Sequence, residues 1–142
     1  TTVMPFCMQE KGTSLRETVK DYHKLAEGRC YTDVSFHLVI SEPSEQVLGQ
    51  DLPALIEDGY TSFKGFMNYD AIRFLTDRLE RGGHIAPKFH GTSRPIPVER
   101  EATHRAISLA ELVDVPVMIV HVSNREAMEE IARARSRGLK VY

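Results

Sequence analysis

The chain has 142 residues, of which 42% are hydrophobic and 27% charged, and its formal net charge is −2. This length allows one domain with its own core and is short for two, because domains cluster around ~100–150 residues. Neither sign of charge forms a long run, so the composition indicates neither a nucleic-acid-binding protein nor a membrane-binding one. The longest apolar run, Val115–Val120, is too short for a bilayer, which takes roughly 20 residues.

The N-terminus and the cysteines indicate the expected compartment. Thr1–Phe6 has no basic leader followed by an apolar block, so no secretory signal is visible and a cytoplasmic protein is expected. Cys7 and Cys30 belong to no CxxC or Cys/His metal spacing. Both cysteines are expected to be reduced and buried, as isolated cysteines inside cells commonly are.

Short β-rich runs alternate with helical periodicity in the first half of the chain, which favours parallel βαβ units. Strands are predicted at Thr1–Phe6, Tyr31–Ile40 and Thr61–Met67. The capping box Ser14-Leu15-Arg16-Glu17 predicts the start of a helix that ends at Gly28. A shorter helix is predicted to open at Asp51, with Pro53 in its first turn, and to end at Gly59.

In the second half, two helices are predicted in succession with no strand between them, at Ala71–Leu79 and Val98–Val113. Pro116–Val122 (PVMIVHV) is then predicted to be a buried strand, because strands of parallel sheets read as continuous apolar runs. A second capping box, Ser123-Asn124-Arg125-Glu126, predicts a helix to Arg137. Leu139–Tyr142 resembles the start of a further strand.

This alternation predicts the α/β class with parallel strands and flanking helices. Periodicity alone leaves two architectures open, a small doubly wound sheet and part of a (β/α)8 barrel. Both place functional residues at the carboxyl ends of strands. Three residues occupy such positions: Lys64 in SFKGF, Tyr69 just after that strand, and His121 in IVHVS.

Each of these residues has a structural and a functional interpretation. Lys64 in an apolar strand either pairs with a carboxylate or reaches a rim, or it is readily neutral and available for modification or catalysis. His121 is either a hydrogen-bonded core residue or a metal ligand, and Tyr69 either packs or donates to developing negative charge. His37 is expected to be structural. Motifs for dinucleotide, P-loop, serine-hydrolase and HExxH chemistry are absent.

Two segments, SFKGFMNYD and SRPIPVEREATHRAISLAELVDVPVMIVHVS, resemble the hydantoinase/dihydropyrimidinase family of the amidohydrolase superfamily. The resemblance runs through nearly the whole chain. It implies a fragment of a (β/α)8 TIM barrel, with strands matching the second, third, fourth and sixth. It also implies hydrolysis of a cyclic amide or imide, such as a hydantoin or dihydropyrimidine, two divalent metal ions, usually zinc, and a homotetramer or dimer at full length.

The resemblance assigns roles to the three candidate residues. Lys64 matches the lysine that is carboxylated and bridges the two metals, and His121 matches a histidine ligand. Tyr69 matches the tyrosine that holds the substrate's carbonyl oxygen as it becomes an oxyanion. A lysine carbamate is anionic and has two oxygens, which suits it to bridging two cations that activate a water for ring opening.

The family's other metal ligands have no counterpart in this chain. An H-x-H pair is expected before Thr1 and an aspartate after Tyr142, and the strand with the middle histidine is missing, which implies an internal deletion near residues 70–71. Residues 1–142 are therefore predicted to form a single partial barrel domain. Lys64 and His121 alone cannot complete a binuclear site, because each ion needs about three or four donors.

Such a fragment is predicted to be catalytically incompetent by itself and, because of its open sheet edges, prone to aggregate. Two alternatives remain open. One is a non-catalytic scaffold or assembly protein of the same fold, against which the retention of Lys64 and His121 argues. The other is a genuine short protein that packs as a small α/β binding module.

Overall fold

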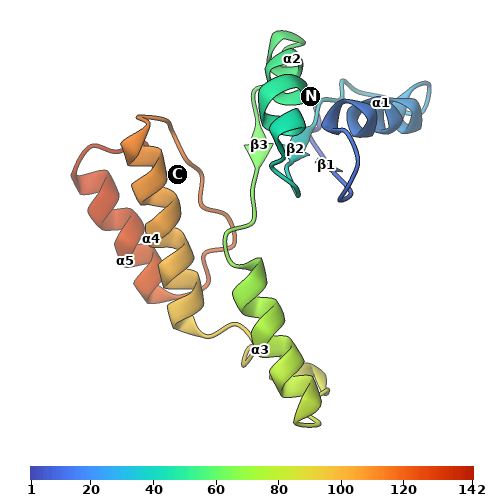
Figure 1. Ribbon diagram of the computed structural model, residues 1–142. Coiled ribbons are helices and arrows are strands. Elements are labelled where there is room, and N and C mark those ends of the chain that lie inside the picture. Colours follow the sequence, from blue (N-terminus) through green and yellow to red (C-terminus); the bar gives the residue numbers. More distant parts are fainter. The chain divides into compact units, whose positions relative to one another are not determined.

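The computed structural model describes all 142 residues, Thr1–Tyr142. The chain divides into two compact units, Thr1–Phe66 and Met67–Tyr142, which Figure 1 shows in blue to green and in green to red. The boundary between the units falls close to the deletion predicted near residues 70–71. A single partial barrel domain over residues 1–142 stays a prediction.

The first unit is built on a parallel sheet with the strand order β1-β2-β3. The strands are β1 (Phe6–Met8), β2 (His37–Val39) and β3 (Phe63–Lys64). Cys7 aligns with Leu38, and Val39 aligns with both Met8 and Lys64. The parallel pairing confirms the predicted α/β class.

All three strands are shorter than predicted. The predicted strand Thr1–Phe6 is wrong in its bounds, since β1 begins only at Phe6 and Val3 forms an isolated bridge to Val34. β1 and β3 are both edge strands, so each has a pairing partner on one side only. The central strand β2 is as short as β1, so pairing extends over only three residues even where a strand has neighbours on both sides.

Two helical segments follow the strands of this unit. Helix α1 (Leu15–Ala26) has Ser14 as its N-cap, and the Ser14 side chain accepts a hydrogen bond from the Glu17 N–H at 3.4 Å, which confirms the predicted start. A π-helix, η1 (Val47–Asp51), continues directly into α2 (Leu52–Glu57). The predicted opening of α2 is confirmed, because Asp51 is its N-cap residue and Pro53 lies in its first turn. The π-helix before it was not predicted, and the Asp51 side chain makes no cap bond in its own helix but binds α1.

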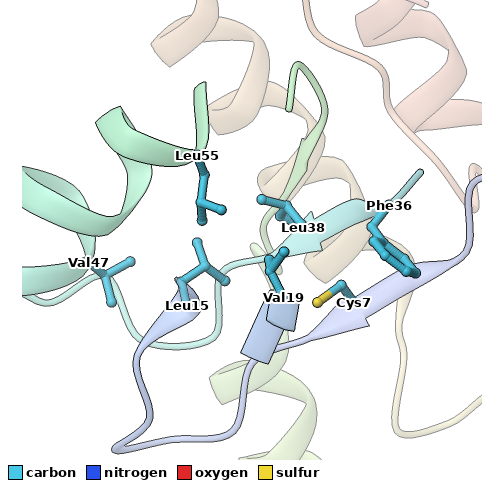
Figure 2. Packing of buried hydrophobic residues seen from close by; sticks show 7 residues of the cluster. All are labelled: Cys7, Leu15, Val19, Phe36, Leu38, Val47 and Leu55. Atoms are coloured by element: carbon cyan, nitrogen blue, oxygen red, sulfur yellow. The ribbon is translucent and has the colours of Figure 1, made fainter. Parts of the chain in front are cut away.

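The core of the first unit lies between one face of the sheet and the helices. Its buried members gather from β1, β2, α1, η1 and α2 in Figure 2: Cys7, Leu15, Val19, Phe36, Leu38, Val47 and Leu55. Because side chains alternate along a strand, the residues next to Cys7 and Leu38 in the sequence point to the other face of the sheet. That second face carries Phe6, His37 and Lys64.

The second unit is helical. Its elements are α3 (Tyr69–Arg81), the 3-10 helix η2 (Pro87–Phe89), α4 (Ile96–Leu112) and α5 (Arg125–Ser136). The prediction of two successive helices with no strand between them, α3 and α4, is confirmed. α4 and α5 lie side by side (Figure 1), and they run parallel, since Glu99 meets Ser123 at one end and Glu111 meets Arg137 at the other.

The predicted buried strand Pro116–Val122 is wrong. The segment forms only one isolated parallel bridge, between Val117 and Val141, which is also all that remains of the strand predicted at Leu139–Tyr142. Val117 and Ile119 pack against the core of α4 and α5, whereas Met118 is 68% exposed. An apolar run is buried as a parallel strand only when other elements cover both of its faces. In this unit, α4 and α5 cover the face with Val117 and Ile119, and the face with Met118 stays exposed.

Two further predictions differ in detail. The N-cap of α5 is Asn124, whose side chain accepts from the Ala127 N–H at 2.9 Å, because Ser123 is engaged by Glu99. Cys7 is buried as expected, but Cys30 is exposed, and both thiols are free. None of the helices combines the length and the apolar character needed to cross a membrane.

Candidate functional site

Lys64 ends the last strand of the sheet, on the face opposite the core. Its side chain is half-buried, and its ammonium lies 4.4 Å from the centre of the Phe6 ring and 5.3 Å from that of Phe66. Its carbonyl accepts a hydrogen bond from the Ile40 N–H at 3.0 Å. Aromatic faces stabilise a cation, so side chain and main chain together fix Lys64 at the carboxyl end of β3.

His37 occupies the same face of the sheet. Its Nδ1 shares a hydrogen bond of 2.6 Å with the Ser62 hydroxyl, and its ring centre lies 5.6 Å from that of Phe6. The Phe6 ring therefore contacts both His37 and Lys64. Sequence reasoning did not single out Phe6 or Ser62, because alternation along one strand does not reveal which residues of a neighbouring strand share its face.

The loops after β1 and β2 are joined at the same edge of the sheet. The Gln9 side chain lies between them and is 4% exposed. It accepts hydrogen bonds from the N–H groups of Ser41 and Glu42, and the Glu42 carboxylate in turn accepts from the Gly12 N–H at 2.7 Å. None of these residues was identified from the sequence, because no short motif marks them.

Tyr69 is the first residue of α3, in the second unit. The helix was predicted to start at Ala71, and it starts two residues earlier, with Asp70 in the first turn, where a carboxylate interacts favourably with the helix dipole. The Tyr69 side chain is 56% exposed.

His121 lies near the end of the extended segment after α4 and is exposed. Its φ of 61° is in the left-handed region, which histidine adopts more readily than β-branched residues do. Ser123 follows His121 by two residues, and both its N–H, at 2.7 Å, and its hydroxyl donate hydrogen bonds to the Glu99 carboxylate. The Asn124 N–H donates to the same carboxylate at 3.3 Å. Burial alone would raise the pKa of Glu99, but these bonds outweigh it and lower the pKa.

The donors in this chain do not make up a metal centre. No group of three or more His, Cys, Asp or Glu side chains lies close enough together to hold a metal ion. Lys64 belongs to the first unit, and Tyr69 and His121 belong to the second. The site residues predicted from the sequence stay predictions.

Comparison with known proteins gives a consistent result over the whole chain. No family model matches it. A D-hydantoinase from Streptomyces coelicolor is 36% identical over all of this chain and 37% of its own length, and a dihydropyrimidinase from Dictyostelium discoideum is 32% identical over all of this chain and 35% of its own. The crystal structure of a dihydropyrimidinase from Brevibacillus agri covers the whole chain with a TM-score of 0.90 and 31% identity, using 38% of that protein.

The lengths of these matches carry a second finding. The chain spans about 37% of the length of the curated relatives that it matches. The match to the Streptomyces coelicolor protein runs over 174 positions, whereas the chain has 142 residues. At least 32 positions of that relative, the difference between these lengths, therefore have no counterpart in this chain.

Proposed function

Because this chain is a partial member of the hydantoinase/dihydropyrimidinase family, we propose that it is part of a cyclic-amide hydrolase that opens the ring of a hydantoin or a dihydropyrimidine. The observation that carries the proposal is similarity over the whole chain, at 36% and 32% identity, to proteins named D-hydantoinase and dihydropyrimidinase. The similarity of the fold to a dihydropyrimidinase structure, with a TM-score of 0.90, supports it independently of single motifs.

We further propose that the complete protein requires divalent metal, zinc in the first instance, with Lys64 and His121 among its ligands. The position of Lys64 at the carboxyl end of a parallel strand supports this role, because active sites of such barrels lie at that end. His121 is exposed at the end of an extended segment. The remaining donors would come from residues outside this chain.

The proposed role of Tyr69 is to donate a hydrogen bond from its phenol to the ring carbonyl oxygen of the substrate. A donor placed where negative charge develops lowers the barrier to hydrolysis of an amide. The exposure of the Tyr69 side chain supports this assignment.

The proposed place of the chain in the barrel has β1, β2 and β3 as the second, third and fourth strands and residues 116–122 as the sixth. All four would belong to one partial domain with a deletion near residues 70–71. The 32 or more unmatched positions of a relative support a deletion, and its proposed place agrees with the direct succession of α3 and α4. We propose a dimer or homotetramer for the complete protein.

By itself the chain is proposed to be catalytically incompetent, since it lacks a cluster of three or more ligands. The test is made on the complete protein, by measuring its metal content and its ring opening of hydantoin and dihydrouracil. Lys64→Ala and His121→Ala should abolish activity and lower the metal content. Tyr69→Phe should keep the metal and lower kcat by roughly 10²–10³-fold, the usual cost of losing one such donor.

Matched controls are available in the same chain. Lys88→Ala and Tyr31→Phe alter exposed residues of the same types, and both should leave activity and metal content unchanged. A complete protein that binds zinc and opens neither ring would overturn the proposed activity and favour the non-catalytic scaffold.

A further inference from the structure

Gln9 is a buried polar residue whose side chain bonds only to main-chain groups. Its Oε1 accepts from the Ser41 N–H at 3.1 Å and from the Glu42 N–H at 3.2 Å. Its Nε2 donates to the Thr13 carbonyl at 2.9 Å. One amide group thus connects the loop after β1, which contains Thr13, with the loop after β2.

These bonds continue to the strand that carries Lys64. The Gln9 main-chain N–H donates to the Val39 carbonyl at 3.3 Å, and the next residue, Ile40, donates from its N–H to the Lys64 carbonyl at 3.0 Å. Gln9 therefore holds the chain on both sides of Ile40, through Val39 before it and Ser41 after it. The carboxyl ends of all three strands are joined in this way.

We propose that Gln9 is a positioning residue that fixes the loops after β1 and β2 at the substrate-binding edge of the sheet. This rests on the proposed function, because a barrel enzyme binds its substrate at the carboxyl ends of its strands. Gln9 is too buried to touch a cyclic amide itself. It acts through the loop residues that it orders.

The bonding pattern requires an amide of this length. Two N–H groups need an acceptor, and the Thr13 carbonyl needs a donor, which a glutamine supplies at once. Methionine has a similar size and supplies neither group. Glutamate keeps the acceptor for Ser41 and Glu42, but an ionised carboxylate cannot donate to the Thr13 carbonyl and places a second acceptor opposite it.

The test compares Gln9→Met with Gln50→Met in the complete protein. Gln50 is exposed on η1 and serves as the matched control. In Gln9→Met, the Ser41 and Glu42 amide protons should exchange faster with solvent, and KM for hydantoin and dihydrouracil should rise about tenfold, as expected if one loop conformation in ten remains competent to bind. The kcat per folded enzyme should change by less than about threefold, because saturating substrate binds the competent conformation and draws the whole population into it.

A purely structural role would lower the melting temperature and leave KM per folded enzyme unchanged, and that result would overturn the proposal. Unchanged exchange at Ser41 and Glu42 would overturn it too. If Gln9→Met does not fold, Gln9→Glu replaces it in the test. Slow exchange of the Ser41 and Glu42 amide protons together with a nearly normal KM would support the proposal. Fast exchange of these protons together with a raised KM would contradict it. In a complete protein that opens neither ring, the proposed function fails, and the exchange rates alone decide whether Gln9 fixes the loops.

Discussion

The carboxylate of Asp51 accepts a hydrogen bond from the main-chain N–H of Leu15 at 2.8 Å, across 36 positions of sequence. The same oxygen accepts from the Ser14 hydroxyl at 2.7 Å, and the other accepts from the Gln46 side chain at 3.2 Å. Asp51 is 2% exposed. A residue of η1 thus completes the N-terminal cap of α1 and joins the two helical segments over the core.

Replacing Asp51 with alanine should destabilise the protein by about 2–4 kcal/mol, because buried donors lose a charged acceptor and α1 loses part of its cap. The measurement is urea unfolding followed by circular dichroism. Asp58→Ala, at an exposed carboxylate after α2, is the matched control and should have little effect. An equal loss in both variants would show that the bonds of Asp51 contribute nothing specific.

Stability should also depend on pH through Asp51. Burial alone would raise its pKa, but the bonds from Ser14, Gln46 and Leu15 lower it below the ordinary value of 3.8. A depressed folded-state pKa stabilises the fold at pH values above the unfolded-state pKa, and this contribution disappears as the pH falls through the folded-state pKa. Asp51→Asn should therefore flatten the fall of the urea midpoint below about pH 4, and an unchanged slope would contradict this assignment.

The Asp51 bonds also show what sequence could and could not predict. The start of α1 at Ser14 depends on residues within one turn, so the local pattern predicted it. The opening of α2 at Asp51 was predicted in the same way. The bond between the Asp51 side chain and Leu15 was not predicted, because a local pattern cannot reveal a partner 36 residues away. The segment 116–122 was misjudged for a related reason, since its apolar pattern does not reveal whether neighbouring elements cover it.

The residues of the candidate site also fall into those that the sequence predicted and those that it did not. Lys64, Tyr69 and His121 were predicted as site residues because predicted strand ends and family motifs mark them. Gln9 and Glu99 were not found, because they act by binding main-chain groups of loops distant in sequence. Such contacts leave no residue spacing in the sequence.

Glu99 should hold the segment that follows His121. Glu99→Ala removes the acceptor for three hydrogen bonds and should speed solvent exchange at the Ser123 and Asn124 amides, with a loss of roughly 1–2 kcal/mol. Glu99→Gln keeps one acceptor oxygen for both N–H groups and should lie near the wild type. Glu129→Ala, which removes an exposed ion pair within α5, is the control. Fast exchange in that control as well would show general fraying of α5.

The two cysteines should differ in reactivity. Cys30 is exposed and should react with a thiol reagent at once in the native protein. Burial raises the pKa of Cys7 to about 11, and with its thiol inaccessible it should react only as fast as the protein unfolds. Titration of the native protein with a thiol reagent at pH 8 should show one rapidly reacting thiol per chain, and Cys30→Ser should remove it. Two equivalents reacting at one rate would mean that the core around Cys7 opens freely.

The extended segment after α4 should control the solubility of the isolated chain. Met118 is 68% exposed and Val120 is 46% exposed, while the segment has one bridge, on one side only. Unpaired main-chain groups beside exposed apolar side chains can pair with another chain. Met118→Lys should therefore reduce light scattering by residues 1–142 expressed alone. Ile119→Lys, at the neighbouring position that packs against the core, should increase it, because a buried charge destabilises the second unit. If both substitutions improved solubility equally, added charge would explain the effect, and the direction of the side chain would not matter.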